Sequence, residues 1–289
     1  MKRVSVRGTL SAATMQNVLR EVTSPEGRPL AAVFEIDLSG LSFIDAGGIV
    51  IFTNLLEWLK RRPVRAQLVG YQGYGQAIRY LDDCGFFKHH LGHPLKEFAS
   101  LRETTLPVTT VAHAQSHGWL EFTAMPWLAS KLQMSTASLS DLSVSLKELF
   151  NNIVDHSTEQ IACIHVQWHP KQNQIRVAVS DFGVGIAREV QRLHPHLNDP
   201  EAIFWASEEG FSTKPGGRNL GAGLAILIDN VVERNGGEVQ IYANRGSLLC
   251  KGGQRITAET RAFYPGTLVN ITLRTDTIEL VPEREDLQW

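Results

Sequence analysis

The sequence predicts two units: an α/β unit over residues 1–92 and an α+β two-layer sandwich over residues 106–280. Two observations carry this fold class. The chain has 289 residues, and domains hold roughly 100–200 each. The first part alternates strand and helix patterns, which favours a parallel or mixed sheet, whereas later strands follow one another through short turns.

The first unit reads strand, helix, strand, helix, strand, helix. The strand patterns are short and rich in β-branched or aromatic residues, and the helix patterns place apolar residues three or four apart. Ser11 is a candidate cap for the first helix. The expected strands are residues 4–6, 31–38 and 65–70, and the expected helices are residues 11–22, 46–59 and 75–84.

Residues 93–105 are expected to be a linker, and residues 281–289 a tail. In the second unit the helices are predicted at 138–157 and 221–235, with helical fragments broken by prolines between 187 and 218. The predicted strands form hairpins and a closing strand: residues 106–112, 118–122, 161–168, 174–180, 238–243, 246–250 and 266–274.

Composition excludes several classes of function. The net charge of −2 gives no bulk electrostatic attraction to nucleic acid or acidic membranes. The three cysteines are too few and too widely spaced for a disulfide framework or a zinc site. The most apolar windows are too short to span a bilayer, so we expect a cytoplasmic protein.

Two local clusters have a simple structural interpretation. The basic run 60–65 follows a helix, where basic residues favour the helix dipole, so we do not expect a nucleic-acid contact there. His89, His90 and His93 suggest a metal, but no carboxylate partner stands at a recognisable spacing. A helix end followed by the linker is the favoured interpretation.

A helix and a strand end offer the first two candidate groups for chemistry. Glu148, Asn152 and His156 are spaced by four, which gives one polar line on the helix 138–157. An amide oxygen suits Mg²⁺, and a carboxylate one turn away can act as a general base. Asp181, followed by Gly183 and Gly185, ends a buried strand, where a carboxylate can accept a hydrogen bond from an exocyclic amine.

A glycine-rich run offers the third group. Gly221, Gly223 and Leu224 open an apolar helix, and free N–H groups at such a helix start suit a phosphate. The run lacks the Gly-Lys-Ser/Thr of a Walker loop. Thr267 opens the last strand, and its hydroxyl is a candidate partner for the Asp181 carboxylate.

Together, in this order, these motifs resemble the Bergerat-fold ATP-binding domain of the GHKL group, which includes gyrase-type ATPases, Hsp90, sensor histidine kinases and anti-sigma-factor kinases. Glu-Leu-x-x-Asn-x-x-x-His at 148–156, Asp-x-Gly-x-Gly at 181–185 and Gly-x-Gly-Leu at 221–224 carry the resemblance. It implies ATP and Mg²⁺ as cofactors, with Asn152 as the Mg²⁺ ligand and Glu148 as the catalytic base.

The resemblance also implies roles for the remaining residues. Asp181 would bind the adenine amino group, and residues 187–220 would form a lid over the nucleotide. Asn219 stands where sensor kinases commonly have glycine. The other residues expected around the nucleotide are His156, Gly183, Gly185, Lys214, Gly221, Gly223, Leu224 and Thr267.

The first unit is similar to STAS domains in the run Leu38–Ile49. In that family the loop commonly carries a phosphorylatable hydroxyl after the aspartate. Here Ala46 and Gly47 occupy those positions, so we expect a docking or regulatory unit without a phosphorylation switch.

The resulting hypothesis is an ATP·Mg²⁺-binding regulator with lid-gated binding of a protein partner, acting as a slow ATPase or an anti-sigma-type Ser/Thr kinase. A nucleotide-sensing adaptor without catalysis is the alternative, and Glu148 favours catalysis. Prolines and strand patterns in 94–137 argue against a sensor kinase, and the short segment after residue 275 argues against a gyrase-like machine. The sequence leaves a homodimer open.

Overall fold

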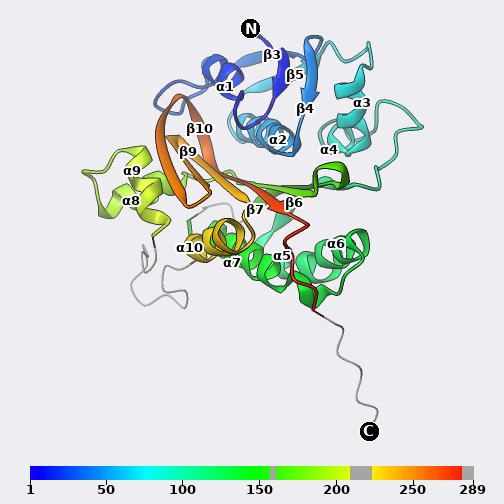
Figure 1. Ribbon diagram of the computed structural model, residues 1–289. Coiled ribbons are helices and arrows are strands. Elements are labelled where there is room, and N and C mark those ends of the chain that lie inside the picture. The colour runs from blue at the N-terminus through cyan, green and yellow to red at the C-terminus, as the bar shows by residue number, and fades with distance from the viewer. Residues whose placement is uncertain (157–160, 209–222, 282–289) are drawn as a thin grey trace.

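The computed structural model describes residues 1–156, 161–208 and 223–281, without the side chains of residues 113, 152–156 and 161. Figure 1 shows α2 (Ala46–Lys60) between the strands of the N-terminal unit and a larger sheet, with further helices beneath that larger sheet. This arrangement confirms the predicted α/β unit followed by an α+β sandwich.

The N-terminal unit is built on short parallel strands. β1 (Lys2–Ser5), β3 (Val33–Asp37) and β5 (Arg65–Val69) form one parallel sheet in the order β1-β3-β5. β2 (Gly8–Leu10) pairs in parallel with β4 (Leu41–Ile44). The remaining helices of this unit are α1 (Gln16–Val22), α3 (Gln76–Asp83) and α4 (Phe86–Leu91).

The first predicted helix begins later than residue 11. The carbonyl of Ser11 accepts hydrogen bonds from the N–H groups of Thr14 and Met15, and the Ser11 hydroxyl lies 3.3 Å from the Thr14 hydroxyl. These local bonds close a turn, so α1 starts at Gln16 and Ser11 does not cap it.

The second unit is an antiparallel sheet in the order β6-β7-β8-β10-β9. Helices α7 (Ser140–His156) and α10 (Gly223–Ile228) cover one face and pack against each other. The strands are β6 (Thr105–Ala112), β7 (Ile161–His169), β8 (Gln174–Asp181), β9 (Glu238–Lys251) and β10 (Gln254–Arg274). The other helical segments are α5 (His113–Trp119), η1 (Leu120–Ala124), α6 (Met125–Leu132), η2 (Thr136–Leu139), η3 (Pro170–Gln172), α8 (Ile186–Leu193), α9 (Asp199–Ala206) and η4 (Asp229–Arg234).

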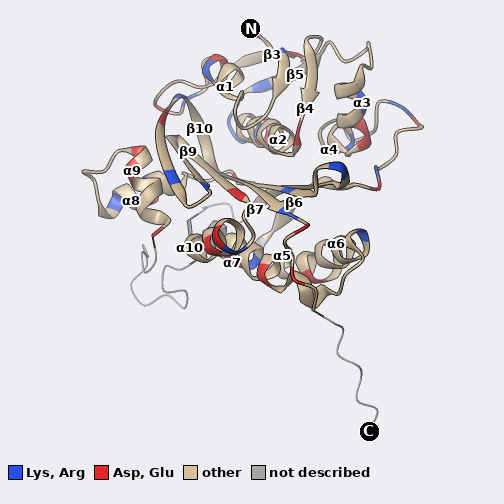
Figure 2. Cartoon of the chain, viewed as in Figure 1, with Lys and Arg blue, Asp and Glu red and all other residues tan. Residues whose placement is uncertain are grey.

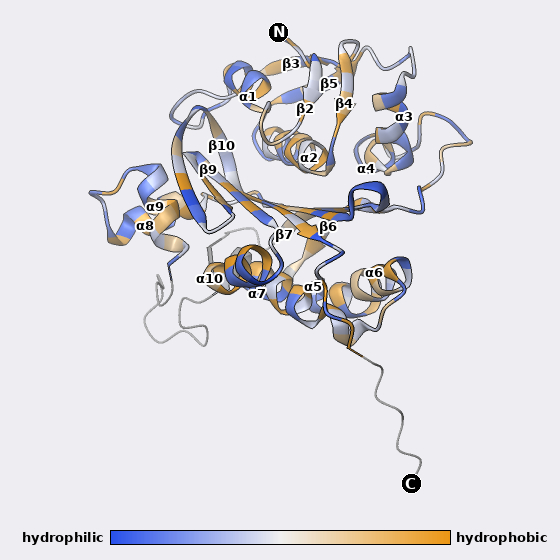
Figure 3. Ribbon diagram, viewed as in Figure 1, coloured by the Kyte–Doolittle hydropathy of each residue, from blue (hydrophilic) through white to orange (hydrophobic). Residues whose placement is uncertain are grey.

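α2 packs against the other face of this sheet. It contacts β7, β8 and β10, and nearly all of its side chains are buried, from Ala46 to Leu59 with Glu57 half-buried. A helix that is apolar nearly all round is buried on most sides, and Figure 3 shows α2, with many hydrophobic residues, between the strands of the N-terminal unit and the larger sheet. One apolar cluster therefore joins the units, from Phe34 and Phe52 to Ala178 and Leu268.

The predicted strand at 118–122 is wrong, because this stretch is helical in α5 and η1. Leu120, Ala124 and Leu128 recur every four residues and are buried in the helix-side core. α5 packs on α7. Packing on a neighbouring helix therefore overrides the strand preference of the bulky residues in this segment.

The predicted hairpin between 238 and 250 is also wrong, because β9 is one continuous strand. Asn244 lies at φ +54°, and the pairing of β9 with β10 shifts register beside it. Asn244 thus marks a β-bulge rather than a turn. The true turn is Gly252–Gly253, where both φ angles are positive, as a two-residue hairpin favours.

The distribution of charges and the state of the cysteines agree with what the composition predicts. Figure 2 shows basic and acidic residues interspersed over both units. Arg61 and Arg62 of the basic run lie over the rings of Phe182 and Trp58, at 4.5 Å and 4.3 Å. Cys84, Cys163 and Cys250 are buried and free. Among the described residues, no helix is long and apolar enough to cross a membrane.

Candidate functional site

Asp181 ends β8 on the helix-covered face of the sheet. Side chains alternate along a strand, and Ile175, Val177 and Val179 all lie in the core beneath the helices. Ala178 and Phe182 belong instead to the cluster that includes α2. The period of two therefore directs the Asp181 carboxylate away from the N-terminal unit.

The carboxylate of Asp181 is buried and held by two backbone donors. Gly183 N–H donates to Oδ1 at 2.6 Å, and Thr267 N–H donates to Oδ2 at 3.1 Å. Burial raises the pKa of Asp181 to about 6, although these hydrogen bonds oppose the shift. Each carboxylate oxygen has further acceptor capacity, so the group can still receive a hydrogen bond from a ligand.

Two glycines permit the close approach of the chains around Asp181. Gly266 has φ +83°, and a Cβ there would lie 2.3 Å from the Asp181 carbonyl oxygen. Gly185 has φ +89°, and its Cβ would lie 2.8 Å from the Gly266 carbonyl oxygen. Both positions therefore need glycine, for conformation and for space.

Asn244 is a member of this site that the sequence motifs did not indicate. Its Nδ2 donates to the carbonyl of Val184 at 3.0 Å, and it stands against the Cβ position of Gly185. It is buried at the bulge of β9. The sequence offered one signal for it: Asn tolerates a positive φ, and Asn244 stands two residues before Gly246. The same pattern also favours a turn.

Thr267 connects the end of β8 to the start of α8. Its hydroxyl accepts a hydrogen bond from Ile186 N–H at 2.9 Å, and the same hydroxyl favours the charged form of Asp181. One side chain thus ties the helix that follows the glycines to the strand that holds the carboxylate.

The predicted polar line falls on α7, as the spacing indicates. Glu148 is half-buried, and its helix packs into the same core as β8. Asn152 and His156 follow at four-residue intervals on that helix, but their side chains lie outside the described part of the structure. Asn151 Oδ1, a hydrogen-bond acceptor, lies 3.3 Å from His117 Nε2 of α5.

The glycine-rich run is described only from Gly223. Gly223 begins α10, and Leu224 is buried in the core that α10 shares with α7. Lys214 and Gly221 lie outside the described residues, as do residues 209–220 of the expected lid. The described part of that lid contains α8 and α9, and Asp199 accepts hydrogen bonds there from Gln191 Nε2 and from Arg245 N–H.

The N-terminal unit contacts β8 and β10 on the sheet face opposite α7 and α10. Asn54 Nδ2 of α2 donates to the carbonyl of Pro265 at 2.7 Å, next to Gly266. The hydroxyl of Tyr264 lies 2.8 Å from that of Ser180, next to Asp181. The hydrogen bond from α2 therefore reaches the residue next to Gly266, and the Tyr264–Ser180 contact joins β10 to β8 next to Asp181.

The described residues of the site suit a ligand that carries a hydrogen-bond donor such as an amine. They offer a buried carboxylate whose oxygens each keep capacity for a further hydrogen bond. Glu148 supplies a half-buried carboxylate on α7, which packs into the same apolar core as β8.

Comparisons with known families agree with this geometry. Residues 139–275 match the family of histidine kinase-, DNA gyrase B-, and HSP90-like ATPases, and residues 2–102 match the STAS domain. A search of curated protein sequences finds no match to the chain.

Proposed function

We propose that this chain, which carries a STAS domain followed by a histidine kinase-, DNA gyrase B- and HSP90-like ATPase domain, is an ATP·Mg²⁺-dependent regulator of a protein partner. The two domains fit an ATP-binding regulatory protein. The observation that carries the proposal is Asp181, a buried carboxylate on the helix side of the sheet with acceptor capacity left for the adenine amino group.

The residues present fit the nucleotide. In the proposal Asp181 receives the adenine amine, Gly183 and Gly185 shape the pocket beside it, and Thr267 holds the carboxylate in place. Gly221, Gly223 and Leu224 would place backbone N–H groups near the phosphates, with Lys214 as a cation from the lid. Such a phosphate site needs no basic surface, which is compatible with the net charge of −2.

The polar line of α7 fits a hard cation by donor type. Glu148, Asn152 and His156 follow one another at intervals of one helical turn on α7. The amide oxygen of Asn152 is a suitable ligand for Mg²⁺. Mg²⁺ would neutralise phosphate charge when bound. Glu148 would hold the proton of an attacking water or hydroxyl, which is the step that distinguishes an enzyme from a binder.

The contacts of α2 support a regulatory role for the STAS domain. Ala46 is buried, and a Cβ added at Gly47 would lie 3.3 Å from Asn270 Oδ1 of β10. The loop that carries a hydroxyl in related STAS domains thus faces the ATPase sheet here. We propose that this domain acts on the ATPase through α2, and that the partner binds at the lid side in the cytoplasm.

Turnover tests the catalytic part of the proposal. The protein is incubated with Mg·ATP while phosphate release and protein phosphorylation are followed. Glu148→Ala should lower turnover by about 10²–10⁴-fold, the range of a general base, while Glu121→Ala, an exposed carboxylate on η1, should not. ATP binding without turnover in the unaltered chain would favour the adaptor instead, and turnover unchanged by Glu148→Ala would exclude Glu148 as the base.

A further inference from the structure

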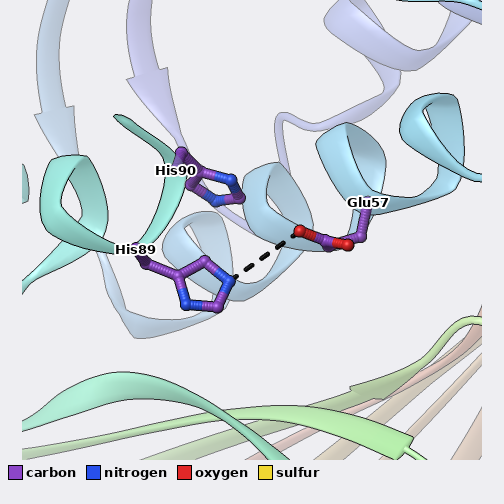
Figure 4. A group of neighbouring side chains, drawn as sticks. All are labelled: Glu57, His89 and His90. Carbon is purple, nitrogen blue, oxygen red and sulfur yellow. Dashed lines mark ion pairs between the residues drawn. The ribbon is translucent and has the colours of Figure 1, made fainter. Parts of the chain in front are cut away.

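The histidines at the end of the N-terminal unit lie beside a carboxylate that is distant in the sequence. Glu57 of α2, His89 and His90 of α4 each place one ligand atom within 4.8 Å of the others. Figure 4 shows the three side chains converging between the two helices. Within the described residues, no other group of three His, Cys, Asp or Glu meets this spacing.

Packing of α4 on α2 holds these side chains in place. Phe86 stacks on Phe52 of α2 with ring centroids 5.1 Å apart, and Phe86 and Phe87 are fully buried. The His90 ring rests on Phe86 at 4.5 Å, and its Nε2 lies 3.3 Å from the hydroxyl of Thr53. The ligands therefore stand on two packed helices rather than on a mobile loop.

The donor set suits a divalent transition metal. Zn²⁺ takes imidazole nitrogens at about 2.0–2.1 Å and carboxylate oxygens at about 2.0–2.2 Å, and two histidines with one carboxylate form a known kind of open site. His89 Nε2 and Glu57 Oε1 are 3.9 Å apart, so a small side-chain rotation brings both onto one ion.

Nearby charge sets an upper limit on affinity. Lys60 lies close enough to lower the pKa of both histidines, so its positive charge offsets part of the attraction that Glu57 provides. With three protein ligands the ion would keep a fourth position for water. We therefore expect weaker binding than in a four-ligand structural site.

We propose that Glu57, His89 and His90 bind one divalent transition-metal ion of the zinc class, which links α4 to α2. His93 lies outside this group: it is exposed, and its Nδ1 lies 2.9 Å from the carbonyl of Pro94. The site is separate from the nucleotide pocket, and its test needs no ATP.

The test is a titration of the full chain, without an affinity tag and after treatment with a chelator. Zn²⁺ binding is followed by calorimetry, and Co²⁺ binding by its visible absorption. We expect one ion per chain, and an affinity at least about tenfold lower in Glu57→Gln and His90→Ala, since even outer partners of metal ligands contribute about 10–100-fold. His93→Ala is the matched control and should bind like the unaltered chain.

Glu57→Gln keeps the size of the side chain, so it tests the site even if His90→Ala disturbs the packing of α4 on α2. Circular dichroism checks that each variant is folded. Binding that Glu57→Gln leaves unchanged, or the absence of stoichiometric binding in the unaltered chain, would overturn the proposal.

Discussion

Ser180 and Asp181 are neighbours on β8, yet they lie on opposite faces of the sheet. Ser180 is fully buried toward the N-terminal unit, where its hydroxyl meets that of Tyr264 at 2.8 Å. Asp181 is directed toward the helices, and its carboxylate keeps acceptor capacity for a ligand. The same strands thus pack against α2 on one face, and on the other they combine an apolar core under the helices with the Asp181 carboxylate at the end of β8.

The difference teaches how the two domains are related. The face under α2 belongs to one apolar cluster with the core of the N-terminal unit. A domain held by such a cluster differs from one that is tethered by a linker, because removing it would expose the sheet. The unit that matches STAS domains therefore shares an apolar cluster with the unit that matches the ATPase family.

The largest expected effect is a loss of stability from a substitution beside Asp181. Gly266→Ala places a Cβ where the Asp181 carbonyl lies and forces a side chain into φ +83°. We expect a loss of about 3 kcal/mol or more in the free energy of unfolding. Chemical denaturation measures it. Gly73→Ala, where a Cβ would meet nothing within 4 Å, should change little.

A smaller effect is expected at the face that α2 covers. Asn54→Ala removes the hydrogen bond to the Pro265 carbonyl and leaves that group unsatisfied, which should cost about 1–3 kcal/mol. Both domains should still unfold in a single transition, because they share a core. Two separate transitions, or an effect no greater than that of Asn17→Ala at an exposed position of α1, would contradict this.

The smallest expected effect is a dependence of stability and ATP affinity on pH, through the Asp181 carboxyl. Burial raises the pKa of Asp181 to about 6, from the model-compound value of 3.8. For folding, this group contributes stability below pH 3.8 that is lost as pH rises through about 6.

For binding, the adenine amine needs the charged form, so ATP affinity should fall by up to about tenfold from pH 7 to pH 5. Titrations with ATP across that range would show a flat profile if Asp181 does not contact the nucleotide.

Much of the fold followed from local patterns, and the failures have physical causes. The helix at 46–59 was correct because apolar residues run through it, although the pattern could not say that a second sheet covers it. The region around Asn244 was misread because Asn followed closely by Gly suits a turn and a bulge equally. Residues 118–122 were misread because packing on α7 outweighs local preference.

The site divides in the same way. Asp181, Gly183 and Gly185 were proposed from a strand end and its glycines, and Thr267 from the start of the last strand, because those motifs are short and local. Asn244 and the contacts of α2 depend on strands and helices that meet only in the folded chain. Glu57 stands far from His89 in the sequence, so no spacing could join them.

The most direct test compares nucleotide affinity in variants of the two neighbouring residues. Asp181→Ala and the equally sized Asp181→Asn should weaken ATP binding at least about tenfold, since a hydrogen bond to a charged group contributes about 1.5–3 kcal/mol. Ser180→Ala, on the opposite face, should stay close to the unaltered chain. Circular dichroism confirms folding of all three, and normal ATP binding by both Asp181 variants would contradict the assignment of this pocket.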